Sequence, residues 1–125
     1  MADDTLYLML WDWKRQYNWA VETFGPGLRD EALDAHIRKE LVEVKQAAET
    51  GDSKLTAEEW MDVIILASEA AMRRLVDAGE EDPATALLET YHSKMKANEA
   101  RRWPDWRKAD PKRPIEHDRS GEAQP

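Results

Sequence analysis

The stretch that decides the fold runs from His36 to Glu69, HIRKELVEVKQAAETGDSKLTAEEWMDVIILASE. Apolar residues recur at helical spacing on both sides of the turn-forming residues Thr50–Ser53, which predicts two helices joined by a short turn. Such a turn makes the two helices antiparallel neighbours. We therefore expect an all-α fold built around this hairpin.

Two acidic couplets repeat the same spacing within the hairpin. Glu40 and Glu43 lie three residues apart, and so do Glu59 and Asp62. A helix places residues three apart on one face, and Glu40 and Asp62 fall among apolar side chains. Because the helices are expected to be antiparallel, the couplets should face each other. Four carboxylates held together repel one another unless cations lie between them.

The couplets therefore predict a metal site. All-oxygen ligands suit Mg²⁺ or Mn²⁺, and two or more such ions would clamp a phosphate chain and activate water. A plainer alternative is that Glu59, three residues after Thr56, only closes a capping box. His36 precedes Glu40 by one turn, and a supporting or structural role suits it better than ligation.

The rest of the chain is also expected to be helical. Asp3, Asp4 or Thr5 would cap the first helix, and Asp82 would cap the fourth. The third helix is apolar nearly all the way round, which predicts that it is the most buried. We see no strand pattern and no glycine-rich phosphate loop. The expected helices cover residues 5–24, 30–48, 56–78 and 83–102.

Composition sets the broad class. The 125 residues predict one domain over residues 1–104 and a polar tail over 105–125, either disordered or laid over a neighbour. A charged content of 35% suggests much solvated surface or a core completed by oligomerisation. The net charge of −8 argues against nonspecific nucleic-acid binding.

The residue inventory also bears on compartment and cofactors. The chain has no cysteine, which excludes disulfides, thiolate catalysis and cysteine zinc sites. Asp3 and Asp4 stand where a signal peptide would be basic, and no apolar run approaches the roughly 20 residues of a membrane span. We therefore expect a cytoplasmic protein that binds no membrane.

A second polar group lies on the fourth expected helix. Lys94, Asn98 and Arg101 follow the spacing KxxxNxxR, which puts them on one stripe. A cation, an amide and a guanidinium in line suit phosphate oxygens. The alternative is an ordinary basic helix C-terminus. Glu89 and His92 form a single ExxH pair, too little for a di-iron site.

Six tryptophans are many for this length. Trp13 and Trp60 are candidates for base stacking, and so is Trp19. The alternative for Trp13 and Trp60 is core packing. Trp11 and Trp19 lie off the main apolar stripe, which suggests an oligomer interface or a ligand pocket. Trp103 and Trp106 are candidates for anchoring the tail.

Taken together, these motifs resemble a known family. Residues 30–106 are similar to the MazG-like all-α nucleoside triphosphate pyrophosphohydrolases. The segments HIRKELVEV and KMKANEARRWPDW look more specifically like the dATP/dGTP diphosphohydrolase branch, which includes the phage MazZ enzymes associated with 2-aminoadenine DNA. One departure is Lys39, where the general family often has a glutamate. The resemblance rests on Glu40-x-x-Glu43, a 15-residue gap and Glu59-x-x-Asp62.

The resemblance implies both a reaction and an assembly. It implies a helical core completed by a second protomer, as a homodimer or homotetramer, and hydrolysis between the α- and β-phosphates. If the MazZ-like branch is right, dGTP is the substrate and dGMP feeds 2-aminoadenine nucleotide synthesis in a phage. Lys94, Asn98 and Arg101 carry over as phosphate contacts. The metal ligands carried over are Glu40, Glu43, Glu59 and Asp62.

Besides a di-iron carboxylate protein, which should purify with iron, two other functions remain open at this point. A broad house-cleaning hydrolase would remove surplus or non-standard nucleotides with the same motifs. A helical interaction module would use the acids only for solubility. The first differs from a dGTP enzyme in its base preference, and the second in having no metal-dependent activity.

Overall fold

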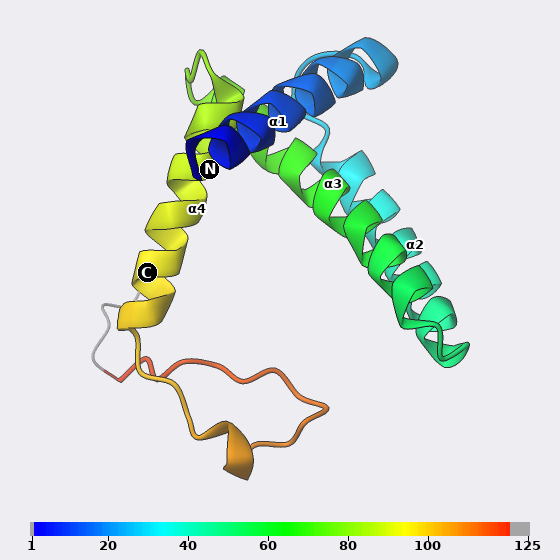
Figure 1. Cartoon of the computed structure of the whole chain (residues 1–125), viewed down its shortest axis with the longest axis vertical. Helices are drawn as coiled ribbons and strands as arrows, with labels where there is room; N and C mark the ends of the chain where they lie inside the picture. Colours follow the sequence, from blue (N-terminus) through cyan, green and yellow to red (C-terminus); the bar gives the residue numbers. More distant parts are fainter. Residues whose placement is uncertain (1, 121–125) are drawn as a thin grey trace. The chain divides into compact units, whose positions relative to one another are not determined.

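The computed structural model describes residues 2–120, with the side chains of residues 2–4 and 6 left aside. This part of the chain holds helices and no strand, so the expected all-α class is confirmed (Figure 1). The elements are α1 (Ala2–Phe24), α2 (Asp30–Glu49), α3 (Ser53–Asp77), α4 (Pro83–Ala100) and the short 3₁₀ helix η1 (Trp106–Lys108).

The chain divides into two compact units, Met1–Glu89 and Thr90–Pro125. The first unit contains the α2–α3 hairpin and α1, which packs on α3 (Figure 1). The hairpin is the main helix pair, as the sequence predicted. Gly51 makes its turn possible, because its backbone adopts φ +78°, a left-handed conformation that suits glycine.

Several helix boundaries differ from those expected. α1 already begins at Ala2, before the expected caps, and α4 ends at Ala100. α3 begins at Ser53 because Asp52 is its N-cap, with Oδ1 accepting a hydrogen bond of 3.0 Å from the Leu55 amide. The expected start near Thr56 is therefore wrong. The capping-box alternative for Glu59 falls with it.

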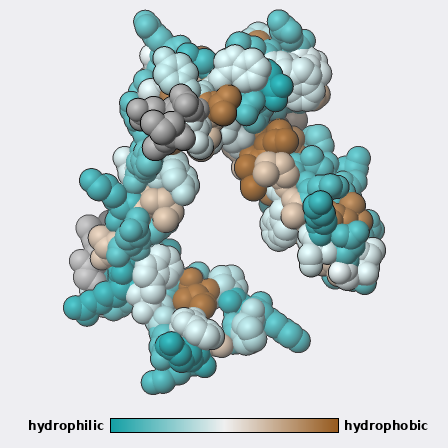
Figure 2. Space-filling model, in the orientation of Figure 1, coloured by the Kyte–Doolittle hydropathy of each residue, from teal (hydrophilic) through white to brown (hydrophobic). Residues whose placement is uncertain are grey.

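The first unit has a small core, to which each helix contributes few side chains. Met72 is fully buried, whereas Trp60 and Ile64 of the same helix are 49% and 54% exposed. The expectation that α3 is the most buried helix is therefore wrong for a single chain: it has four buried residues, as has the shorter α2. Figure 2 shows apolar atoms at the surface of the hairpin.

A buried guanidinium holds α1 and the following loop to α3. Arg73 and Glu69 are each 2% exposed and pair through Nε and Oε2 at 2.9 Å. Arg73 Nη1 also donates to the carbonyl oxygens of Gly25 and Gly27, at 2.7 and 2.8 Å. Both glycines have φ near +90°, which lets the loop turn both carbonyls toward one donor. Arg73 Nη2 reaches the carbonyl of Ala20 at 3.3 Å.

Replacing Arg73 should therefore unfold much of the first unit. Arg73→Met leaves the buried Glu69 carboxylate with only the 3.4 Å contact of Arg29 Nη1, and three carbonyls lose a donor, a change that costs about 3–5 kcal/mol. The matched control is Arg74→Met, because Arg74 forms an exposed pair with Asp30 at 2.9 Å. Such a pair contributes about 0–1 kcal/mol. Urea unfolding followed by circular dichroism measures both, and equal losses would contradict the assigned role of Arg73.

Candidate metal and nucleotide site

The hairpin brings three of the four expected carboxylates together. Glu40 and Glu43 come from α2 and Glu59 from α3, and one carboxylate oxygen of each lies within 4.8 Å of the other two. The i, i+3 spacing on α2 and the antiparallel packing of α3 produce this arrangement. Among the described residues, this is the one group of three acidic, histidine or cysteine side chains close enough to share an ion.

Asp62 lies one turn beyond Glu59 on α3, outside that trio. Its charge still acts on the trio, because it helps to raise the pKa values of both Glu40 and Glu59. Asp62 and Glu40 both line the cavity next to the cluster. The fourth expected ligand thus belongs to the same acidic region.

The electrostatics of the cluster favour proton or cation binding. A hydrogen bond with the Glu43 carboxyl is the largest cause that raises the pKa of Glu40, followed by burial and by the charges of Glu43 and Asp62. Burial comes first in raising the pKa of Glu59, followed by the charges of Glu43 and Asp62. Two carboxyl groups can share a hydrogen bond only if one of them holds a proton.

One atom of Glu40 fits the expected metal. Oε1 faces His36 Nε2 at 3.2 Å, whereas the buried Oε2 has no hydrogen-bond donor among the described residues while the Glu40 and Glu43 carboxyls are both ionised. Buried polar atoms rarely lack a partner, and such an exception indicates an unseen proton, water or ion. An all-oxygen cluster with one such atom suits Mg²⁺ or Mn²⁺. His36 supports Glu40 through this pairing, in keeping with the role expected from the sequence.

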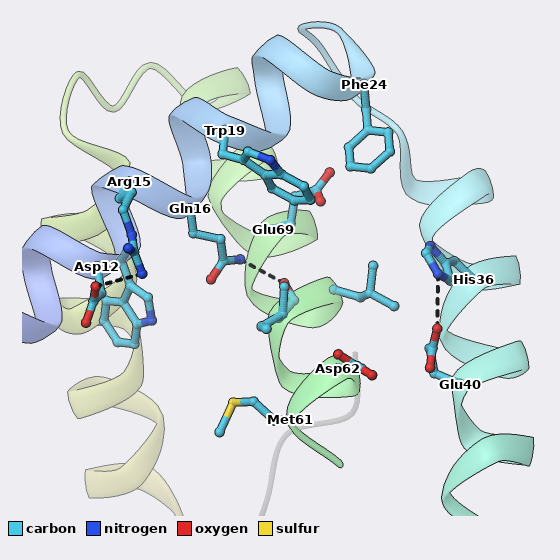
Figure 3. A pocket seen from close by; sticks show the side chains of 13 residues that line it. Asp12, Arg15, Gln16, Trp19, Phe24, His36, Glu40, Met61, Asp62 and Glu69 are labelled. Carbon is cyan, nitrogen blue, oxygen red and sulfur yellow. Dashed lines mark hydrogen bonds and ion pairs between the residues drawn. The ribbon is translucent and has the colours of Figure 1, made fainter. Parts of the chain in front are cut away.

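A cavity of about 760 Å³ adjoins the cluster and is walled by α1, α2 and α3. In Figure 3, Trp19 and Phe24 lie at its α1 end, His36 and Glu40 on α2, and Asp62 on α3. Its size lies within the usual range for small-molecule sites, roughly 300–1,000 Å³. The lining residues are Asp12, Trp13, Arg15, Gln16, Trp19, Phe24, His36, Glu40, Met61, Asp62, Ile65, Leu66 and Glu69.

The structure separates the two tryptophans expected to bind a base. Trp13 lines the cavity beside Glu40 and Asp62, and so does Trp19. Trp60 instead lines a smaller hollow near the hairpin turn, with Gly51 among its neighbours. Base stacking by Trp13 and Trp60 stays a prediction, and only Trp13 lies in the cavity that the acids also line.

The expected phosphate contacts belong to the second unit. Arg101 Nη1 donates to Asn98 Oδ1 at 2.9 Å, so these two side chains meet as their spacing predicts. Lys94 is exposed on α4, the helix of Asn98, whereas Arg101 follows the end of that helix at Ala100, so the expected helical stripe is wrong at Arg101. Their contact with phosphate stays a prediction.

The expected tail is described as far as residue 120, and residues 121–125 lie outside the described part. Trp103 Nε1 donates to the Asn98 carbonyl at 2.7 Å, and its ring lies 5.5 Å from that of His117. The Asp118 amide donates to the Arg102 carbonyl at 2.8 Å. The chain therefore folds back on the end of α4 within the second unit. Trp106, by contrast, is 67% exposed.

Three polar cavity residues on α1 were not singled out from the sequence. Asp12, Arg15 and Gln16 line the cavity beside the aromatic side chains. Gln16 Nε2 donates to the Ile65 carbonyl at 2.9 Å and to Ser68 Oγ at 3.0 Å, which joins α1 to α3. The only sequence signal is their placement in WDWKRQYNW, where three tryptophans stand among polar residues.

Comparison with known proteins identifies the class. A sequence model of the family dATP/dGTP pyrophosphohydrolase matches residues 13–121. The match covers most of the chain, including the whole hairpin, and the chain belongs to this family. It is therefore a nucleoside triphosphate pyrophosphohydrolase, and the resemblance seen in the sequence is confirmed at that level. Neither a curated protein nor a solved structure matches the chain.

Membership of this family favours an enzyme and leaves the choice between a dGTP enzyme and a house-cleaning hydrolase open. An interaction module without activity is not supported. The described helices include none long and apolar enough to cross a membrane.

The raised pKa of Glu40 predicts a pH-dependent stability difference in metal-free protein. A carboxyl whose pKa is higher in the folded state stabilises the fold when protonated. This contribution is complete below the ordinary pKa of 4.5 and is lost as pH rises through the raised value. Glu40→Gln mimics the protonated form. It should match the wild type near pH 4 and unfold at higher temperature than the wild type near pH 8.

Thermal unfolding in EDTA across this pH range measures the difference. Glu49→Gln is the matched control, since Glu49 is exposed at the end of the same helix. Mn²⁺ should then raise the unfolding temperature of the wild type more than that of Glu40→Gln. If the difference in unfolding temperature between Glu40→Gln and wild type stayed constant with pH, the raised pKa of Glu40 would not be its cause.

Proposed function

We propose that this protein hydrolyses purine deoxynucleoside triphosphates with the help of Mg²⁺ or Mn²⁺, and that dGTP is its preferred substrate. The products are dGMP and pyrophosphate. Water adds to the α-phosphorus, and the bond from that atom to the oxygen that bridges to the β-phosphate breaks. The observation that carries the metal dependence is the buried Oε2 of Glu40, which lacks a donor within a cluster of three carboxylates.

Glu40, Glu43, Glu59 and Asp62 are the proposed ligands. Two or more bound ions would neutralise charge on the phosphate oxygens and lower the pKa of a water molecule. The hairpin holds the site in position, because each carboxylate belongs to a residue of a helix rather than of a loop. His36 fixes Glu40 through its 3.2 Å contact with Oε1. The cavity beside Glu40 provides room for the nucleoside.

Lys94, Asn98 and Arg101 are proposed to contact phosphate oxygens. Their chemistry suits this role, and the 2.9 Å bond between Arg101 and Asn98 orders two of the side chains. The preference for dGTP draws support from the segments that resemble the MazZ-like branch. A supply of dGMP for 2-aminoadenine nucleotide synthesis in a phage is part of the same proposal. A broad house-cleaning hydrolase is the alternative.

Product analysis tests the reaction directly. With Mg²⁺, dGTP should yield monophosphate and pyrophosphate, and excess EDTA should stop the reaction. Glu59→Gln should lower kcat/KM on the order of 100-fold, because it removes one charge from the group that holds the ions. The neighbouring Glu58→Gln is the control, since Glu58 lies outside the trio. Release of diphosphate and phosphate would exclude this reaction.

Base preference needs a separate measurement. Steady-state kcat/KM for dGTP, dATP, dCTP, dTTP and dUTP should be highest for dGTP, with dATP next. Equal values for all five substrates would favour the house-cleaning alternative.

We also propose that the protein is a homodimer or homotetramer. The exposed Trp60 and Ile64 of α3, with Val42 of α2 (55% exposed), form apolar surface that a second protomer would cover. Light scattering should give two or four times the chain mass of 14.5 kDa. Ile64→Glu should lower that mass, whereas Ile115→Glu, at an apolar residue outside the hairpin, should not. A wild-type monomer at micromolar concentration would refute this assembly.

A further inference from the structure

The α1 wall of the cavity carries polar groups that metal binding does not require. Asp12 and Arg15 lie on this wall in Figure 3, across the cavity from His36 and Glu40 on α2. Trp13 and Trp19 line the same cavity. Aromatic faces beside a few polar groups are the usual composition of a site for a flat heterocycle.

Glu40 joins this cavity to the carboxylate cluster, because it belongs to both. If the proposed function is right, the phosphates of the substrate lie toward Glu40. The nucleoside then extends toward α1, into a volume of about 760 Å³. The polar groups of α1 thus meet the base rather than the phosphates.

Besides the donors of Arg15, two groups on this wall can accept hydrogen bonds from a ligand. Asp12 Oδ1 is held by Arg15 Nη2 at 3.2 Å, while the carboxylate keeps further lone pairs for a ligand. Gln16 Nε2 is occupied by Ile65 and Ser68, so its Oε1 is the atom left to accept. Asp12 is also half-exposed, with 56% of its side chain accessible. It can therefore reach a ligand without disturbing the core.

We propose that Asp12 determines the preference for guanine by accepting hydrogen bonds from N1–H and the 2-amino group of the base. These two donors are adjacent and match the two oxygens of a carboxylate. Adenine presents a lone pair at N1 and no 2-amino group, so the same carboxylate repels it. Hypoxanthine keeps N1–H but lacks the 2-amino group, and it should rank between the two. This assignment rests on the proposed function and names the residue that reads the base.

The competing explanation is that Asp12 and Arg15 form an ordinary surface ion pair at i, i+3. Asp34 and Arg38 supply the matched case, an exposed i, i+4 pair at 3.1 Å on α2 that does not line the cavity. Asp12→Asn and Asp34→Asn therefore remove the same charge from the same kind of pair, once inside the cavity and once outside.

The experiment measures kcat/KM for dGTP, dITP and dATP with Mg²⁺ in both variants and in wild type. Asp12→Asn should lower the ratio of dGTP to dATP roughly 10- to 100-fold, the usual worth of a bidentate base contact. The preference for dGTP over dITP should shrink as well. Asp34→Asn should leave both ratios unchanged. An Asp12→Asn enzyme with wild-type ratios, or with equal losses on all three substrates, would overturn the assignment.

A second measurement separates this inference from the proposed reaction. Calorimetric titration with dGMP, dIMP and dAMP in EDTA probes the base contact without metal or hydrolysis. Wild type should bind dGMP most tightly, and Asp12→Asn should lose that preference. If wild type releases no pyrophosphate from any substrate yet shows this pattern, the proposed function fails and the guanine contact stands. If wild type binds the three monophosphates equally, the guanine contact is wrong.

Discussion

The buried guanidinium of Arg73 is the constraint on which the rest of the first unit depends. Removing a charged pair from water is costly, and the cost is offset only when nearly every polar atom finds a partner. Arg73 meets this condition through Glu69 and the carbonyls of Gly25, Gly27 and Ala20. Its partners belong to α1, the following loop and α3 itself. This one side chain therefore holds the α1 wall of the cavity to the hairpin.

In the carboxylate cluster, unlike the Arg73 network, neighbouring charges have the same sign. Glu69 is buried with a matching cation, whereas Glu40 is buried among other acids and keeps an oxygen without a donor. Rules of stability are broken most often where function requires it. The hairpin carries the strained group at mid-helix, where regular backbone hydrogen bonds hold it in place. The well-satisfied pair, by contrast, lies at the end of the hairpin that adjoins α1.

Regular helical spacing made the hairpin and its acidic couplets predictable from the sequence. The turn at Gly51 and the couplets on α2 and α3 need only local rules, and the hairpin followed from them. The Arg73 network could not be foreseen, because Glu69 and Arg73 at i, i+4 have the same spacing as a solvent-exposed pair. Its partners on the loop are backbone atoms, which leave no trace in the side-chain pattern.

The start of α3 and the contents of the cavity were missed for related reasons. Asp52 competes with Thr56 as a cap, and Glu59, three residues after Thr56, gave Thr56 the added signal of a capping box. Asp12 lies nearly fifty residues from Glu59, and only the packing of α1 on α3 brings the middle of α1 near the acids. Trp60 follows the reverse pattern, since it adjoins Glu59 in sequence but lines a different hollow.

Glu40 lines the cavity and also belongs to the cluster, so an ion and a nucleoside bound as proposed would not bind independently. An ion that draws the Glu40 carboxylate into the cluster changes the wall that a nucleoside meets, and a bound nucleoside changes the position of that ligand in turn. Thermodynamic linkage makes such an effect reciprocal: the factor by which one ligand alters the affinity of the other is the same in both directions. A nucleotide that strengthens ion binding would therefore itself be held more tightly where the metal is abundant.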